Sequence, residues 1–217
     1  MKSVVITQSN YVPWRGWFDM VSRADCLVLL DSVQYTRRDW RNRNRIKTAQ
    51  GLTWLTIPTE VKGKFAQAID ETRISSSRWC QEHLRTLELA YRRAAHFEST
   101  FPWISETLRR ASAETMLTKV NEVLLAAICE RLNIGVQIMR DVHLLPRAAL
   151  AEMEPTERLV ALAEAVAATR YISGPAARAY LDPEKFAARG IELSWMEYPK
   201  YPEYPQLWGA FEPAVSI

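Results

Sequence analysis

The pattern of apolar positions at the N-terminus predicts a βαβ unit. Residues 4–6 and 26–30 are continuous apolar runs, and a helical pattern over residues 17–24 separates them. Continuous apolar strands on either side of a helix are typical of a parallel sheet that is buried on both faces. Asp31 and Gln34 follow the second run, at the strand end where open α/β sheets bind ligands. The pattern therefore predicts an α/β fold with a Rossmann-like parallel sheet and polar groups at its carboxyl edge.

The rest of the chain predicts a hairpin, a helical middle and a second α/β stretch. The turn residues 50–51 before an apolar run indicate a hairpin over about 45–57. Apolar residues at helix spacing predict helices over 78–93 and 108–132, whereas 97–103 reads as an aromatic connection. Further strands are predicted at 136–139, 170–174 and 191–195, and further helices at 155–168 and 176–181. We expect one domain over 1–217, with an α/β core of about 1–75 and 134–217 and a helical middle of about 76–133.

Composition narrows the class of protein. The 217 residues are 48% hydrophobic and 24% charged, as in ordinary globular domains. No apolar run approaches the ~20 residues that span a bilayer, and the first residues lack a signal-peptide pattern. We therefore expect a cytoplasmic protein without a membrane partner.

The motifs of several common sites are missing. The three cysteines form no CxxC pair and the three histidines have no metal-ligand spacing, so we expect no metal. GxGxxG, GxxxxGK[ST], HExxH and GxSxG are missing from the sequence. The sequence itself requires no cofactor.

The strongest chemical signal is the cationic segment, residues 36–47, which holds six cations and one carboxylate in a chain of net charge +3. Such a segment usually faces an anion, and arginine forks suit phosphate, carboxylate and nucleic acid alike. Asn42 adds a directional amide and Trp40 adds a flat apolar face. The alternative is a solvated loop or an edge strand guarded by positive charge.

A second candidate lies on the predicted helix over 78–93. Trp79, His83, Leu87 and Tyr91 recur every four residues and share one face. Core packing explains such a stripe, and a histidine within it is more often a hydrogen-bonding group than a catalyst. His83 remains a candidate base.

A set of unusual blocks is spread over almost the whole sequence: 8–18, 30–35, 41–47, 54–58, Trp79 with His83, 171–174, 180–181 and 204–206. With these blocks the chain resembles the WbqC-like family of bacterial proteins. Two departures from the family pattern are Ser9, where a proline is common, and the end at Ile217, where members usually continue into a short apolar tail; either the chain is truncated or it lacks that tail.

The resemblance implies a tailoring role. The family is associated with clusters for O-antigen, other polysaccharides and natural products, and our preferred reaction is acyl or aminoacyl transfer to an amine of a sugar or small molecule. At the level of fold, the opening is similar to nucleotidyltransferases and pantothenate-synthetase-like ligases. Those families carry HxGH where this chain has tryptophans at positions 14 and 17, and a fold does not carry its function with it.

A transferase would use its residues in five ways. Arg38, Arg43 and Lys47 would hold an anionic handle, such as a nucleotide-sugar diphosphate or a phosphopantetheine arm. His83 or Asp31 would act as the general base, and backbone N–H groups after Gly174 would stabilise an oxyanion. The stacking residues would be Tyr11, Trp14 and Trp40, and the remaining substrate-binding residues would be Gln8, Asn10, Gln34, Asn42, Ser173, Tyr204 and Gln206.

Two other functions stay open. A non-catalytic module could recognise a nucleotide sugar or an acyl carrier protein, because amides and aromatics are abundant while obvious catalytic residues are scarce. Nucleic-acid binding through the cationic segment ranks last, because a net charge of +3 is small for that role.

Overall fold

The computed structural model describes residues 1–216, and the chain divides into two compact units. Unit 1 comprises Met1–Ser9, Gly16–Val33 and Cys129–Lys200. Unit 2 comprises Asn10–Arg15, Gln34–Ile128 and the chain from Tyr201 on. A single domain over residues 1–217 stays a prediction.

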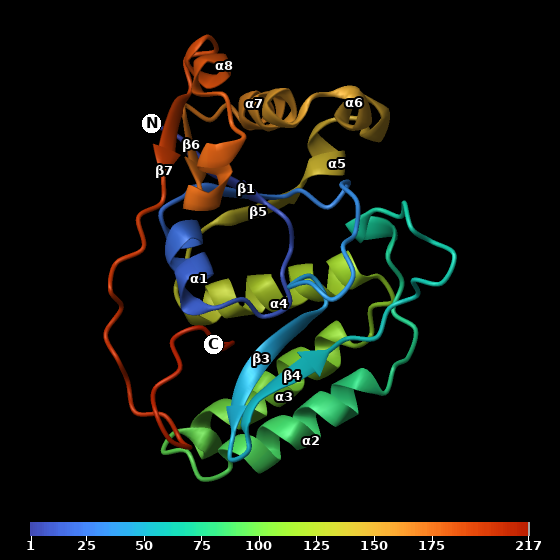
Figure 1. Ribbon diagram of the computed structural model, residues 1–217, viewed down its shortest axis with the longest axis vertical. Helices are drawn as coiled ribbons and strands as arrows, with labels where there is room; N and C mark the ends of the chain where they lie inside the picture. The colour runs from blue at the N-terminus through green and yellow to red at the C-terminus, as the bar shows by residue number, and fades with distance from the viewer. Residues whose placement is uncertain (217) are drawn as a thin grey trace. The chain divides into compact units, whose positions relative to one another are not determined.

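Unit 1 is built on a five-stranded parallel sheet with the order β5-β2-β1-β6-β7 (Figure 1). Numbered along the chain, these strands read 3-2-1-4-5, which is the order of a doubly wound, Rossmann-like sheet. The mixed α/β class with a parallel sheet is confirmed, and the closer similarity to nucleotidyltransferases stays a prediction. The strands are β1 (Ser3–Thr7), β2 (Cys26–Leu29), β5 (Gln137–Arg140), β6 (Arg170–Ser173) and β7 (Glu192–Trp195).

The helices of unit 1 bury apolar faces against these strands. Val4 and Ile6 of β1 join one buried cluster with Leu162 and Phe186 from two helices, and α7 contacts β1 directly. The α-helices are α1 (Arg15–Ser22), whose first residue belongs to unit 2, α5 (Asp141–Leu144), α6 (Arg147–Glu152), α7 (Pro155–Ala165) and α8 (Pro183–Ala187), and a 3₁₀ helix covers Pro175–Ala179.

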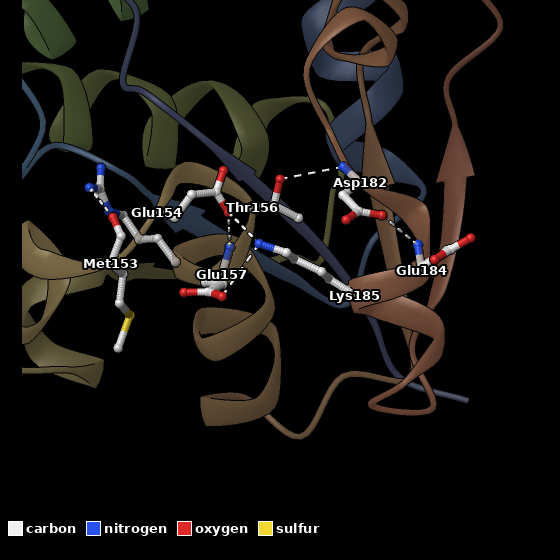
Figure 2. Close-up of polar contacts among 8 residues, drawn as sticks. Met153, Glu154, Thr156, Glu157, Asp182, Glu184 and Lys185 are labelled. Atoms are coloured by element: carbon white, nitrogen blue, oxygen red, sulfur yellow. Dashed lines mark hydrogen bonds and ion pairs between the residues drawn. The ribbon is translucent and has the colours of Figure 1, made fainter.

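Polar side chains fix where α7 and α8 begin (Figure 2). Glu154 is the N-cap of α7, and its carboxylate accepts from the Glu157 backbone N–H and from Lys185 Nζ, the latter at 2.9 Å. Asp182 caps α8 in the same way by accepting from the Glu184 N–H at 3.0 Å. A side-chain oxygen at the N-cap satisfies an N–H group that has no partner within the helix. Because Lys185 belongs to α8, its bond to Glu154 also ties the starts of the two helices together.

Unit 2 combines a β-hairpin with helices. In the hairpin, Arg45 pairs with Trp54, and Gly51 takes the positive φ of 106° that the turn requires. Figure 1 shows α2 and α3 side by side, and α2 also contacts β3. The elements are β3 (Arg43–Thr48), β4 (Gly51–Thr56), a 3₁₀ turn at Ile69–Glu71, α2 (Trp79–Tyr91), α3 (Phe97–Ala111) and α4 (Leu117–Arg131), whose last three residues belong to unit 1.

Two expectations for the helical middle are wrong. Residues 97–103 are not a connection but the first turns of α3, where Phe97 and Phe101 stack at 4.6 Å and Pro102 is tolerated inside the helix. The predicted helix over 108–132 is two helices. The break arises because Leu117 N–H donates to Thr72 O at 2.9 Å, so the backbone there pairs with a distant segment instead of continuing α3.

No helix within residues 1–216 combines the length and the apolar character needed to cross a membrane.

Candidate functional site

The carboxyl edge of the sheet in unit 1 is the first candidate site. Strand order reverses between β1 and β6, which pair in parallel register with Val5 opposite Ile172. Gln8 follows β1, Ser173 ends β6 and Gly174 comes next. Open α/β sheets bind ligands outside the carboxyl ends of the strands at such a reversal point. The fold therefore brings three predicted residues, Gln8, Ser173 and Gly174, to the place where a ligand is expected.

Asp31 lies at the same edge, just after β2. Its side chain is 0% exposed, and its Oδ1 accepts a hydrogen bond from the Ser9 backbone N–H at 2.8 Å. The carboxylate thus ties the segment after β1 to the end of β2. A group with no exposed surface is placed to hold the backbone of Ser9, and its role as a general base stays a prediction.

Asp141 is a residue that sequence reasoning missed. It follows β5, is fully buried, and accepts from the Ser32 N–H at 2.9 Å and from the Val142 N–H at 2.8 Å. Two buried carboxylates therefore organise the segments after three neighbouring strands. The signal was in the sequence, because Asp141 follows its apolar strand as Asp31 follows β2.

The predicted anion-binding helix after Gly174 takes a different form. Residues Pro175–Ala179 form a 3₁₀ helix of five residues, and proline has no N–H. The first N–H after Gly174 is therefore that of Ala176, while Ala177 N–H already donates to Gly174 O at 3.2 Å. A short turn of this kind offers fewer donors than the predicted α-helix at 176–181.

The remaining predicted site residues belong to unit 2, and His83 is central among them. Its Nδ1 lies 2.8 Å from Tyr11 Oη and its Nε2 lies 3.2 Å from Thr56 O. A carbonyl oxygen only accepts, so Nε2 carries the proton and Nδ1 accepts from the Tyr11 hydroxyl. Trp79 packs edge-on against both rings.

Burial keeps this pair neutral. It lowers the pKa of His83 to about 4, and it raises the pKa of the Tyr11 hydroxyl far above its ordinary value. Tyr11 is also too deeply buried to present a stacking face to a ligand. Both ring nitrogens of His83 are engaged, which suits a structural task, and its assignment as a catalytic base stays a prediction.

The predicted amides also hold the chain in place. Asn42 Nδ2 donates to Ile57 O at 2.8 Å, and Gln34 Nε2 donates to Phe65 O at 3.0 Å. Asn10 Oδ1 accepts from Arg41 Nη1. These bonds connect loop segments that have no regular secondary structure, which explains why amides are frequent in this part of the sequence.

Lys47 and Gln206, both predicted to bind substrate, contact each other. Lys47 is only 5% exposed, and its Nζ donates to Gln206 Oε1 at 3.1 Å and to Ala210 O. Gln206 Nε2 in turn donates to Glu212 O at 3.0 Å. In this arrangement the ammonium group fastens the C-terminal tail to the hairpin, and its use as an anion handle stays a prediction.

Tyr204 lies near a residue that sequence reasoning missed, Arg15, and Trp14 contacts the same tail segment. Its guanidinium lies 4.9 Å from the centre of the Tyr201 ring and 5.4 Å from that of Tyr204, and it donates to Pro202 O at 2.8 Å. Trp14 meets Tyr201 edge-on at 6.0 Å. Cation–π contacts thus order the proline- and tyrosine-rich tail. The expected departure from the family pattern at the end of the chain concerns Ile217, which lies outside the described residues.

Arg38, Trp40 and Arg43 complete the predicted set, and they meet at the exposed face of the hairpin. Arg43 Nη2 donates to Arg38 O, and Trp40 lies against Trp54, with ring centres 5.4 Å apart. Trp54 was not predicted, although its pairing opposite Arg45 in a predicted hairpin would have indicated it.

Among residues 1–216, no cluster of three histidine, cysteine, aspartate or glutamate side chains could hold a metal ion.

Comparison with known proteins agrees with the resemblance in sequence. The model of the WbqC-like protein family matches residues 8–217, which includes the carboxyl edge of the sheet and the cationic segment. The uncharacterized protein Rv1507c of Mycobacterium tuberculosis is 46% identical over 217 residues, which is 100% of this chain and 91% of that protein. The chain therefore belongs to the WbqC-like protein family.

Proposed function

We propose that this protein is a tailoring transferase of polysaccharide or natural-product biosynthesis, moving an acyl or aminoacyl group from an activated donor to an amine of a sugar or small molecule. The observation that carries the proposal is the reversal point between β1 and β6: Gln8 follows the end of β1, the buried Ser173 ends β6 and Gly174 comes next. A doubly wound sheet binds its ligand at that place. An acyl carrier protein or a nucleotide-type carrier could present the donor.

The cysteines favour direct transfer over a covalent intermediate. All three are buried, and burial raises the pKa of Cys129 to about 11, whereas a nucleophilic cysteine must reach the thiolate form. In direct transfer the amine nitrogen attacks the carbonyl carbon and the C–N bond forms. The bond to the leaving group breaks, and the departing group takes up the proton that the amine loses.

The contribution of the protein would then be positioning. Holding donor and acceptor in reactive geometry can supply several kcal/mol of the barrier, about 7 or more in favourable systems. Asp31 serves this purpose by fixing the Ser9 backbone beside the carboxyl end of β1. Gln8, half-buried after β1, can bond the bound substrate from the same segment.

A non-catalytic binding module is the second candidate. It is favoured by the burial of both candidate bases, because Asp31 and His83 have almost no exposed surface. A binding module needs the protein groups at the sheet edge that contact the ligand, but it needs no general base.

The two functions differ in whether a product forms. We expect that incubation with a panel of acyl thioesters, aminoacyl donors and amino sugars gives an amide whose mass grows with time, as followed by mass spectrometry. A ligand that binds saturably and raises the melting temperature by mass action, yet yields no amide with any acceptor, would replace the transferase with the module.

A further inference from the structure

One face of the hairpin in unit 2 exposes aromatic rings and cations together. Cross-strand partners in an antiparallel pair project to the same side, so Arg45 and its partner Trp54 share a face, and Arg43, two residues before Arg45, joins them. The alternate residues Asn44 and Ile46 are buried on the opposite face. The hairpin is therefore two-sided, and the aromatic and cationic side is the one open to solvent.

The rings on this side are large and accessible. Trp40 reaches the face from the preceding turn and lies 5.4 Å from Trp54 at an interplanar angle of 42°. The two residues are 41% and 42% exposed. Tryptophans are usually covered in a folded protein, so a neighbouring exposed pair calls for an explanation.

The cations are stacked on these rings. The Arg43 guanidinium carbon lies 4.0 Å from the centre of the Trp54 ring system, and that of Arg45 lies 5.8 Å from Trp40 and 5.6 Å from Trp54. A guanidinium that lies over an indole keeps its N–H groups in its own plane, where they can reach an anion at the edge of the stack. Stacking therefore orients the donors before any ligand arrives.

The donors have few partners inside the protein. Within residues 1–216, neither Arg43 nor Arg45 forms an ion pair, and Arg43 Nη2 donates only to a neutral backbone oxygen, Arg38 O. The carboxylate of Asp39 is paired with Arg41 at 3.3 Å. The positive charge of this face is therefore left for an external anion.

We propose that the hairpin face formed by Trp40, Arg43, Arg45 and Trp54 binds a nucleotide. Phosphate oxygens match the planar guanidinium donors, and a heteroaromatic base matches an exposed indole. Inorganic phosphate alone would use the arginines but not the tryptophans. A neutral sugar alone would use the tryptophans but not the charge of the arginines. The nucleotide can be free, as the handle of an activated donor, or part of a single-stranded nucleic acid. The use of the nucleotide as a donor handle rests on the proposed function. Its binding to the hairpin face does not, because binding needs no turnover.

Isothermal titration calorimetry with nucleoside diphosphates of the five common bases tests this inference. At least one is expected to bind, and the matching nucleoside and inorganic pyrophosphate, each half of the ligand, are expected to bind more weakly. Arg45→Gln and Trp54→Leu should each weaken binding by about tenfold or more, since stacking and charge-assisted contacts are each of that size. Arg45→Lys should also weaken it, because lysine keeps the charge and loses the planar fork.

Arg85→Gln is the matched control, since it removes the same charge from an exposed position on α2 of the same unit. It should leave binding unchanged. Circular dichroism and melting temperature establish that each variant is folded. If Trp54→Leu does not fold, the binding of Arg45→Gln tests the inference by itself.

A short oligothymidylate distinguishes the two sources of nucleotide. Much tighter binding of the oligomer than of thymidine diphosphate, falling steeply with salt, assigns the face to single-stranded nucleic acid. Equal or weaker binding assigns it to a free nucleotide. Binding of none of these ligands, or binding that neither Arg45→Gln nor Trp54→Leu weakens, overturns the inference. Because no turnover is measured, that failure would leave the proposed transfer reaction at the sheet edge unaffected.

Discussion

Acidification from about pH 7 to about pH 4 is expected to remove about 3 kcal/mol of unfolding free energy through His83 alone. Burial lowers the pKa of His83 from 6.5 to about 4 in the folded chain. Between pH 6.5 and about pH 4, His83 is protonated in the unfolded chain and neutral in the folded chain. The stabilisation is therefore fully present above pH 6.5 and is lost as the pH falls toward 4, because protonation favours the unfolded state.

The environment of His83 explains the size of this effect. The imidazole packs edge-on against Trp79, and its two nitrogens are hydrogen-bonded to Tyr11 Oη and Thr56 O. A protonated imidazole in this buried place would not be hydrated. Its Nδ1 would also carry a hydrogen and could no longer accept the hydrogen bond from the Tyr11 hydroxyl. Neither neighbour offers a negative charge in exchange.

Urea unfolding at the two pH values measures the effect. His83→Gln should be less stable than the wild type at neutral pH and should lose much less on acidification. His143→Gln, which removes an exposed imidazole, should follow the wild-type curve. Equal losses in wild type and His83→Gln would contradict the prediction, because carboxyl groups elsewhere would then explain the acid sensitivity.

Asp31→Ala is expected to lower kcat/KM for the proposed transfer by about a hundredfold, since small misplacements of a binding segment can cost that much. The change removes the carboxylate that accepts from the buried Ser9 N–H, and losing the acceptor of a buried donor is costly. Asp31→Asn should cost about tenfold or less, because a carboxamide oxygen can still accept from Ser9. A general base behaves differently, since asparagine cannot take up a proton and both variants would then fail equally.

Asp25→Ala is the matched control for this experiment. Exposed Asp25 accepts through Oδ2 from the Ser3 N–H at 2.7 Å, so it also joins a carboxylate to a backbone N–H, but at the amino end of β1. We expect this variant to lose some stability and to keep its kcat/KM. Loss of activity in Asp25→Ala equal to that in Asp31→Ala would mean that the sheet as a whole, and not its carboxyl edge, was being tested.

Strands β1 and β2 were predictable because each is a short apolar run whose central residues are buried. The break between α3 and α4 was not predictable, because Met116 fits the apolar spacing of a helix that continues through it. What stops the helix there is a backbone pairing of Leu117 with Thr72, 45 residues earlier in the chain. A pattern read along the sequence carries no information on such a partner.

The candidate site shows the same limit. Arg45 and Lys47 are two residues apart on one strand and look equivalent in the sequence. Lys47 is bonded to Gln206 of the tail, 159 residues later in the chain, and is buried. Arg45 lies over the exposed Trp54 ring instead. Asp141 could have been found from the same rule that indicated Asp31. The burial of Tyr11 could not be predicted, because Tyr11 packs against Trp79 of a helix that begins 68 residues later in the chain.

The central claim is that the ligand of this protein occupies the carboxyl edge of the sheet between β1 and β6. Hydrogen–deuterium exchange with and without the donor that gives product tests it most directly. We expect slower amide exchange in peptides that cover residues 8–10 and 174–178 when the donor is bound. Unchanged exchange at both segments, with protection confined to other parts of the chain, would contradict it.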